Sequence, residues 1–233
     1  MLPRTPTVAI VDYSLGNLFS VQNACARVGL RAVITCKKED ILAADAVILP
    51  GVGAFGDAMA NLHKLDLVSP LRDLAARDAP LIGICLGQQL LMSESSEFGN
   101  HRGLGIFEGR VVRFDRPHGP DRILKVPQVG WNRLHLPLAA KRDAWHGSPL
   151  AGLLDGAFMY FVHSFHVQPA NDDVILSTTR YGHIEFCSSL RRGNVLAFQF
   201  HPERSGDQGL RIYHNLAAMI ANRALTQESA HAA

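Results

Sequence analysis

The sequence has no marked excess of charge of either sign and no long apolar run. Its 23 basic and 21 acidic residues give a formal net charge of +2 among 233 residues. This balance offers no electrostatic reason to expect nucleic acid or a membrane surface as the main partner. No stretch approaches the roughly 18 apolar residues that a membrane-spanning helix needs, and Met1 to Thr7 holds no apolar signal core. We therefore expect a cytoplasmic location without export.

Clustered cysteines and metal-binding motifs are lacking as well. Without an export signal, the wide scatter of Cys25, Cys36, Cys85 and Cys187 indicates reduced thiols and no disulfide framework. Neither Cys-x-x-Cys nor His-Glu-x-x-His occurs, and the histidines are scattered, so the sequence does not predict a zinc site. We expect no metal and no cofactor.

The first half of the chain alternates short apolar runs with helical patterns. Hydrophobic residues make up 47% of the chain and charged residues 19%, as in an ordinary globular domain. Continuous apolar strands separated by helices predict a mostly parallel sheet covered by helices on both faces. The strands are expected at 8–11, 31–35, 46–49 and 81–84, and the helices at 17–28, 55–62, 68–77 and 88–95.

The second half is richer in strands, which predicts a mixed or antiparallel portion added to the same sheet. No Ser/Gly/Pro-rich linker separates the halves. We therefore expect one α/β domain over 1–225 and a frayed C-terminal tail at 226–233. The strand candidates lie at 111–114, 130–134, 159–162, 174–179, 184–189 and 195–200, with one helix at 208–224.

Gly83-Ile84-Cys85-Leu86-Gly87 is the sharpest local motif of the sequence. Small residues on both sides of a nucleophile allow a strand to turn tightly into a helix, which leaves the nucleophile exposed above the sheet. The start of that helix would favour the thiolate of Cys85, and the amide of Leu86 could donate to an oxyanion. Taken alone, the motif is equally compatible with a small buried cysteine at a strand end.

His201-Pro202-Glu203 directly follows the apolar run at 195–200. Residues two apart on an extended chain project to the same side, so Glu203 could orient the imidazole of His201. A histidine held by a carboxylate is a competent base for a thiol. A lone His-x-Glu is more often a surface turn, but the pairing with Cys85 favours a site, because open α/β sheets place their sites at the carboxyl ends of strands.

The loop Pro50-Gly51-Val52-Gly53 ends the third expected strand. Glycines on both sides of Val52 allow a backbone amide to turn toward a developing negative charge or away from it. Glycine loops also bind phosphates, but no Gly-Lys-Ser/Thr and no Gly-x-Gly-x-x-Gly is present here. The sequence therefore favours an oxyanion loop over a nucleotide loop.

These three motifs together resemble those of the class I, triad-type glutamine amidotransferases, whose elbow reads Gly-x-Cys-x-Gly and whose base motif reads His-Pro-Glu. Within this class the chain is most similar to the glutaminase subunits of imidazole glycerol phosphate synthases, over nearly its whole length. The other segments that carry the resemblance are Asp12-Tyr13, Gly16-Asn17-Leu18, Ala54-Phe55-Gly56, Gly130-Trp131-Asn132, Tyr160-Phe161-Val162-His163-Ser164 and Gln199-Phe200.

The resemblance implies hydrolysis of L-glutamine by a triad of Cys85, His201 and Glu203. Cys85 would form a thioester and release ammonia, His201 would move the protons, and Glu203 would hold His201. The other site residues implied by the family pattern are Leu86, Gly51, Val52 and Gly53, whose amides would bind the oxyanion, and Gln89, Glu97, His163, Ser164 and Phe165, which would contact glutamine.

The resemblance also implies a heterodimer with a cyclase of TIM-barrel fold, which would use the ammonia to make imidazole glycerol phosphate in histidine biosynthesis. By the same resemblance, Asn17, Gln128, Trp131 and Tyr160 would face this partner. As isolated residues, Trp131 and Tyr160 are more often core aromatics than interface anchors.

Two positions depart from the family pattern, which usually has Met where Gln88 stands and His where Gln128 stands. Neither is a triad position. They leave open a paralogous glutaminase subunit that supplies ammonia to another synthase, for example in surface-polysaccharide sugar amidation. Two further alternatives are a non-catalytic binding subunit, which the intact triad argues against, and a cysteine peptidase or hydrolase that works without a synthase partner.

Overall fold

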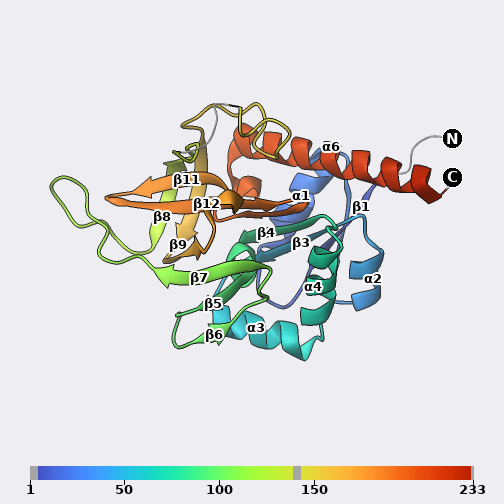
Figure 1. Ribbon diagram of the computed structural model, residues 1–233, viewed down its shortest axis with the longest axis horizontal. Coiled ribbons are helices and arrows are strands. Elements are labelled where there is room, and N and C mark those ends of the chain that lie inside the picture. Colours follow the sequence, from blue (N-terminus) through green and yellow to red (C-terminus); the bar gives the residue numbers. More distant parts are fainter. Residues whose placement is uncertain (1–4, 139–142, 232–233) are drawn as a thin grey trace.

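A mixed 11-stranded sheet runs through the centre of the computed structural model, which describes residues 5–138 and 143–231 (Figure 1). One half of this sheet is parallel, in the order β2-β1-β3-β4-β13. These strands are β2 (Arg31–Thr35), β1 (Thr7–Val11), β3 (Ala46–Gly51), β4 (Leu81–Cys85) and β13 (Val195–Phe198). All five coincide with predicted apolar runs, which confirms the α/β class.

Helices cover both faces of the parallel half. Side chains alternate along each strand, so Val8 and Ile10 join one core while Ala9 and Val11 join the other. The first core also contains residues of α1 (Leu18–Arg27) and α6 (Gly206–His231), and the second contains residues of α2 (Lys38–Ala43), α3 (Phe55–Lys64) and α4 (Val68–Ala76) (Figure 1).

The other half of the sheet is mainly antiparallel, as the second half of the sequence predicts. Beyond β13 the order is β12-β10-β7-β5-β6, and β11 pairs with β12. A separate antiparallel ribbon is formed by β8 (Gln128–Arg133) and β9 (Phe158–His163). The remaining bounds are β12 (Ile184–Arg192), β10 (Phe165–Pro169), β7 (Phe107–Arg113), β5 (Met92–Ser95), β6 (His101–Arg102) and β11 (Ile175–Tyr181), with single 3₁₀ turns at Asp172–Val174 (η1) and Pro202–Arg204 (η2).

The helix expected at 88–95 is wrong in its position. The helix after β4 is only α5 (Leu86–Leu90), and the chain then continues as β5, which pairs in parallel with β7. Every residue of α5 is buried. A short segment that is buried on all sides has no amphipathic period to mark its end, and β5 is defined by pairing with β7, which lies outside this segment.

The last helix is longer than the pattern at 208–224 suggests. α6 continues to His231, so the tail expected at 226–233 is helical as far as the structure describes it, and residues 232–233 lie outside the described part. Within residues 5–138 and 143–231, none of the helices has an apolar stretch long enough to cross a bilayer.

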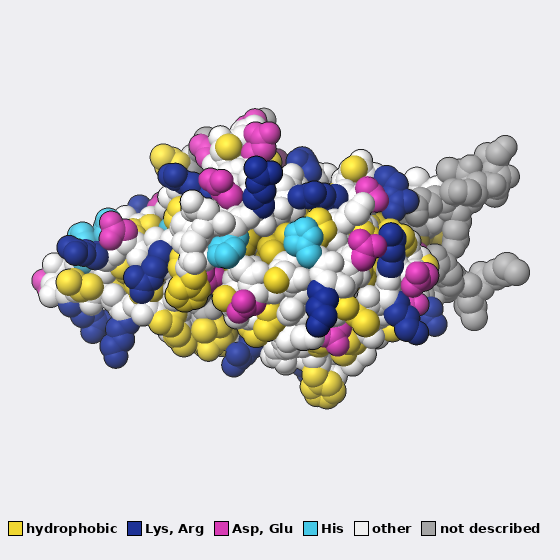
Figure 2. Space-filling model, turned by 90° about the horizontal axis from the view of Figure 1, so that it is seen from below, with side chains coloured by type: hydrophobic (Ala, Val, Ile, Leu, Met, Phe, Trp, Pro, Cys, Tyr) yellow, Lys and Arg dark blue, Asp and Glu magenta, His cyan; other side chains and the backbone are white. Residues whose placement is uncertain are grey.

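The surface has charged side chains of both signs, as the balanced composition predicts. Figure 2 shows basic and acidic side chains interspersed on one face of the molecule, with hydrophobic side chains scattered between them. All four cysteines are free, and only Cys36 is exposed. Cys85 is thus a free thiol in the protein interior.

Candidate active site

Cys85 lies at the sharp turn where β4 ends and α5 begins. Its backbone has φ +53° and ψ −108°, a left-handed conformation that costs a non-glycine residue about 1–3 kcal/mol. The flanking glycines are required by close packing. A Cβ on Gly87 would overlap the carbonyl oxygen of Leu49, and one on Gly83 would lie 2.8 Å from the carbonyl oxygen of Gly87. The nucleophile elbow predicted from the sequence is therefore present.

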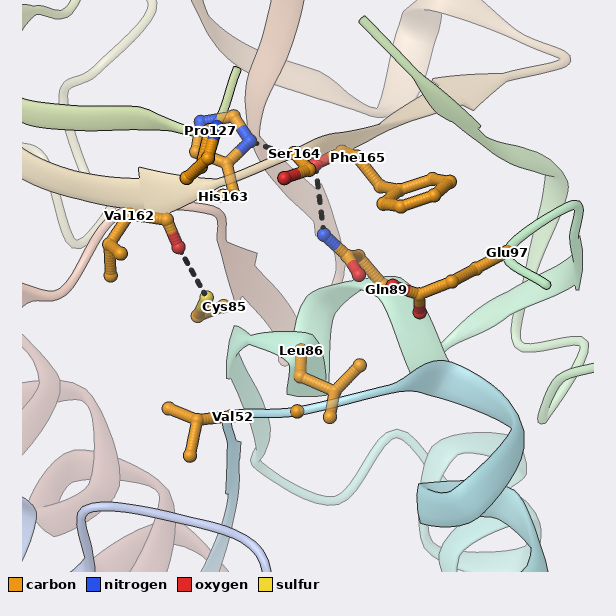
Figure 3. Close-up of a pocket in the computed structure, with 11 residues that line it drawn as sticks. Val52, Cys85, Leu86, Gln89, Glu97, Pro127, Val162, His163, Ser164 and Phe165 are labelled. Carbon is orange, nitrogen blue, oxygen red and sulfur yellow. Dashed lines mark hydrogen bonds between the residues drawn. The ribbon is translucent and has the colours of Figure 1, made fainter. Parts of the chain in front are cut away.

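A cavity of about 260 Å³ opens above Cys85 (Figure 3). Most of the residues expected at the site line it, together with Pro127 and Val162, which the sequence did not single out. The Cys85 sulfur points toward the carbonyl oxygen of Val162, 3.9 Å away. The expected residues that line the cavity are Val52, Gly53, Cys85, Leu86, Gln89, Glu97, His163, Ser164 and Phe165.

His201 and Glu203 form a buried pair that interacts with Cys85, although neither is among the residues that line this cavity. The Nδ1 atom of His201 lies 2.8 Å from Oε1 of Glu203, and the Glu203 side chain is 1% exposed. Burial lowers the pKa of His201, but the negative charge of Cys85 and the bonded carboxylate outweigh it and raise this pKa to about 10. The charge of Cys85 contributes most to this rise, and a hydrogen-bond contribution from Cys85 comes next, although Nε2 has no hydrogen-bond partner of regular geometry among the described atoms.

The carboxyl ends of β3 and β4 bring the glycine loop against Cys85. Gly51 is the register partner of Cys85, so it lies beside the cavity, while Val52 and Gly53 line it. Gly53 has φ +110°, a backbone angle that residues with a side chain rarely adopt. The hydroxyl of Tyr13 donates a 2.7 Å hydrogen bond to the carbonyl of Pro50, a contact that no sequence motif indicated.

Gln89 and Glu97 are held in the cavity by backbone groups. The amide nitrogen of Gln89 donates to the carbonyl of Phe165 at 3.0 Å (Figure 3). Oε2 of Glu97 accepts a 2.7 Å hydrogen bond from the amide of Phe55, the first residue of α3. Both side chains are thereby fixed at the edge of the space above Cys85.

His163 and Ser164 lie where β9 turns into β10. Burial lowers the pKa of His163 to about 3, so the ring is neutral at ordinary pH. Its Nδ1 is 2.8 Å from the carbonyl oxygen of Phe165 and must donate to it. The carbonyl of Ser164 accepts from the amide of Phe114 at 3.0 Å, which ties this turn to the main sheet.

The residues expected to face a partner fall into two groups. Asn17 and Trp131 are exposed and Tyr160 is half-buried, and Trp131 packs edge-on against Tyr160 with 6.1 Å between ring centroids. Gln128 is only 3% exposed, so its side chain lies beneath the surface and not on it. The alternation along β8 that exposes Trp131 also exposes Val129, which the sequence did not single out.

The outer side of the β8–β9 ribbon, here called the β8–β9 face, carries Val129, Trp131 and Tyr160 and is hydrogen-bonded to the backbone of His201. The amide of His201 donates to the carbonyl of Tyr160 at 2.9 Å. Ser205 accepts from the amide of Tyr160 at 3.0 Å and donates to the carbonyl of His201 at 2.7 Å. The backbone of Tyr160 in β9 thus helps to hold His201, while the aromatic ring of the same residue belongs to the β8–β9 face.

Residues 9–218 match the model of the family described as glutamine amidotransferase class-I. The imidazole glycerol phosphate synthase subunit HisH of Rhodopirellula baltica is 46% identical over 210 residues, 90% of this chain and 96% of that protein. The HisH subunit of Moorella thermoacetica is 44% identical over 213 residues, 91% of this chain and 95% of that protein.

Solved structures share the fold at lower identity. A crystal structure of a glutamine amidotransferase is 22% identical with a TM-score of 0.67, over 92% of this chain and 98% of that one. The structure of PurLQS from Thermotoga maritima contains a chain that is 17% identical with a TM-score of 0.67, over 93% of this chain and 100% of that one. The chain thus belongs to the class I glutamine amidotransferases and, within them, to the family of the HisH subunits of imidazole glycerol phosphate synthase.

Proposed function

We propose that this chain is the glutaminase subunit of an imidazole glycerol phosphate synthase and that it hydrolyses glutamine to glutamate and ammonia for histidine biosynthesis. The observation that carries the proposal is the arrangement of Cys85, His201 and Glu203. A thiol at a strained elbow lines the cavity, and a histidine with a raised pKa, itself paired with a buried carboxylate, interacts with that thiol. This is the constellation of an activated cysteine nucleophile.

The chemistry assigned to the triad begins with attack of the Cys85 thiolate on the side-chain carboxamide carbon of glutamine. The negative charge then develops on the amide oxygen, where the amides of Leu86 and the glycine loop would stabilise it. The protonated His201 gives its proton to the departing nitrogen, which leaves as ammonia. Water then attacks the thioester with His201 as the base, and glutamate and the thiolate are regenerated.

Gln89 and Glu97 are the groups assigned to substrate binding. Both nitrogen-bound protons of Gln89 are used within the protein, on Phe165 and Gln199, so its oxygen is the atom left to accept from glutamine. Glu97 keeps one carboxylate oxygen beyond the one bound to Phe55, and it can pair with the α-ammonium group. The carbonyls at 162–165 offer further acceptors.

The partner in this proposal is a cyclase of TIM-barrel fold that forms a heterodimer with this chain. The names of the relatives designate them as subunits, and the exposed Trp131 and Val129 provide an apolar docking face. The bonds between Tyr160 and His201 offer a route by which docking there would reach the triad. A cytoplasmic location goes with this assignment. Relatives named as imidazole glycerol phosphate synthase subunits, at 44% and 46% identity, favour this proposal over the paralogous sugar-amidation subunit.

The decisive experiment measures ammonia release from glutamine by the purified chain, alone and then with the histidine-pathway cyclase of the same organism and its nucleotide ligand. We expect little activity from the isolated chain and strong stimulation by cyclase plus ligand. Cys85→Ala, assayed in parallel, is the control for contaminating glutaminases. Reaction of Cys85 with a glutamine-like alkylating agent but no stimulation would retain the amidotransferase chemistry and assign the chain to another partner.

A further inference from the structure

The side chain of Gln199 contacts the sulfur of Cys85, and the mechanism above gives it no task. Gln199 immediately follows β13 and is two residues before His201 in sequence. It is fully buried, at 0% exposure. Its amide nitrogen lies 3.7 Å from Sγ of Cys85, within the range of a hydrogen bond to sulfur.

The orientation of the Gln199 amide is set by its neighbours. Nε2 of Gln89 lies 3.0 Å from the carbonyl oxygen of Phe165, which can only accept, so this atom is a nitrogen and donates. The same nitrogen of Gln89 also lies 3.1 Å from one of the two side-chain amide atoms of Gln199, the atom assigned as Oε1. Because that position must accept, the oxygen of Gln199 faces Gln89 and its NH₂ group must face Cys85.

A fixed N–H donor beside a buried sulfur favours the charged form of that sulfur. A hydrogen bond to an ionised group is stronger than one to a neutral group, and exclusion of water increases the difference. His201 also acts on this sulfur, mainly through its charge, while its Nε2 has no hydrogen-bond partner of regular geometry among the described atoms. We propose that Gln199 is a further catalytic residue, which stabilises the Cys85 thiolate by donating a hydrogen bond from its side-chain amide to Sγ.

The same contacts join the nucleophile to the substrate-binding amide. Phe165, Gln89, Gln199 and Cys85 form one continuous chain of hydrogen bonds. A change at Gln89 would therefore alter the donor that faces the sulfur. This inference rests on Cys85 as the nucleophile of the proposed function, but it does not depend on the identity of the partner.

The test compares the pH dependence of Cys85 alkylation by iodoacetamide in the full chain and in Gln199→Met, followed by mass spectrometry of the cysteine peptides. Neither glutamine nor a partner is present, so the result is independent of the synthase assignment. Loss of the donor is expected to move the midpoint of the Cys85 profile up by about one pH unit, a tenfold lower rate below that midpoint. Exposed Cys36 is the internal control and should keep its profile.

Two further variants separate an electrostatic role from a packing role. Gln199→Glu keeps the shape but brings a carboxylate to the sulfur, so its midpoint should rise more than that of Gln199→Met. Gln168→Met changes an exposed glutamine outside the site and should shift nothing. If Gln199→Met does not fold, as judged by circular dichroism, Gln89→Met is tested in its place. It removes the hydrogen bond that orients the Gln199 amide, so the midpoint of the Cys85 profile should rise, but by less than the loss of Gln199 itself would cause.

Three outcomes would overturn the inference. The first is an unchanged Cys85 midpoint in a folded Gln199→Met, or in Gln89→Met if that variant decides. The second is an equal movement of the Cys36 profile, which would show a general effect on the protein. The third is no alkylation of Cys85 in the unmodified chain, which would also remove the nucleophile assignment, and this distinguishes failure of the proposed function from failure of the role of Gln199.

Discussion

The hydroxyl of Tyr13 donates its proton to the carbonyl of Pro50, at 2.7 Å, and thereby pins the start of the glycine loop. Burial and the charge of Cys85 raise the pKa of Tyr13 well above its usual range, so the hydroxyl stays a donor. The peptide before Gly51 is held by this bond. Any reorientation of the loop that turns an amide toward the oxyanion must therefore take place after Gly51, around Val52 and Gly53.

Gly51→Ala should destabilise the protein and abolish glutaminase activity. A Cβ there would overlap the Tyr13 hydroxyl and lie 3.0 Å from Cβ of Leu86, and overpacking of this kind costs about 1–3 kcal/mol. Urea unfolding measures the loss. Gly119→Ala, where the nearest atom would be 3.9 Å away, is the matched control. Gly51→Ala combined with Tyr13→Phe should recover part of the stability, and no recovery would mean that the overlap is not the cause.

Gln88→Met should make the protein more stable. Gln88 is fully buried, and within the described part of the chain neither its amide nitrogen nor its amide oxygen has a hydrogen-bond partner. A methionine of similar size removes both unpaired groups, with an expected gain of about 1–3 kcal/mol in the free energy of unfolding. Thermal and urea unfolding would measure it, with exposed Gln208→Met as control. A loss of stability would show that the amide is paired in solution.

Cys85→Ala should abolish ammonia release from glutamine because no other residue replaces the thiolate as nucleophile. The partner synthase supplied with ammonium chloride should remain active in the presence of this variant, since its own site is unchanged. Ammonia release and product formation are measured in the same samples. Residual glutaminase activity above the background of a mock purification would remove Cys85 from its role.

The charge on His201 should depend on Cys85. Burial lowers the pKa of His201, yet Cys85 and Glu203 raise it from 6.5 to about 10. The protonated ring therefore stabilises the fold fully below pH 6.5, and this contribution is lost as the pH rises toward 10. In Cys85→Ala the largest cause of the rise is gone, so NMR of the imidazole nitrogens should show titration at lower pH. An unchanged titration would contradict the coupling.

Trp131→Ala should weaken stimulation by the partner. This residue is 54% exposed on the β8–β9 face, and large aromatic side chains commonly dominate such contacts. We expect binding of the cyclase to weaken by about tenfold or more, measured by titration of glutaminase activity or by calorimetry. Leu154→Ala, another exposed apolar side chain, is the control. Equal affinities for Trp131→Ala and the unmodified chain would place the interface elsewhere.

The sequence predicts the parallel half of the fold well and the segment after the elbow poorly. The runs at 8–11, 31–35, 46–49 and 81–84 are strands buried on both faces, which read as continuous apolar segments. The segment at 88–95 has only the short apolar run Leu90-Leu91-Met92 between polar residues, and its strand β5 depends on pairing with β7. Such non-local pairing is not visible in a local pattern.

The site shows the same division. Cys85 belongs to one local motif, and His201 and Glu203 belong to another. Each motif predicts the local geometry of its own residues, and the fold places His201 where it interacts with both Cys85 and Glu203. Tyr13 and Gln199 act through contacts with residues 37 and 114 positions away, so their partners were not predictable from spacing. A faint signal existed for Gln199, since it is two residues before His201 in an extended segment and can project to the same side.

The burial of all five residues of α5 sets a limit on how this region can vary. Substitutions there that change side-chain volume disturb the core next to Cys85, so a map of mutational tolerance would show intolerance to them whether or not chemistry is selected. A descendant that had lost glutaminase activity would keep most of these residues for packing alone. His201, to which we assign proton transfer, lies outside α5, so we expect substitutions to accumulate there first after such a loss.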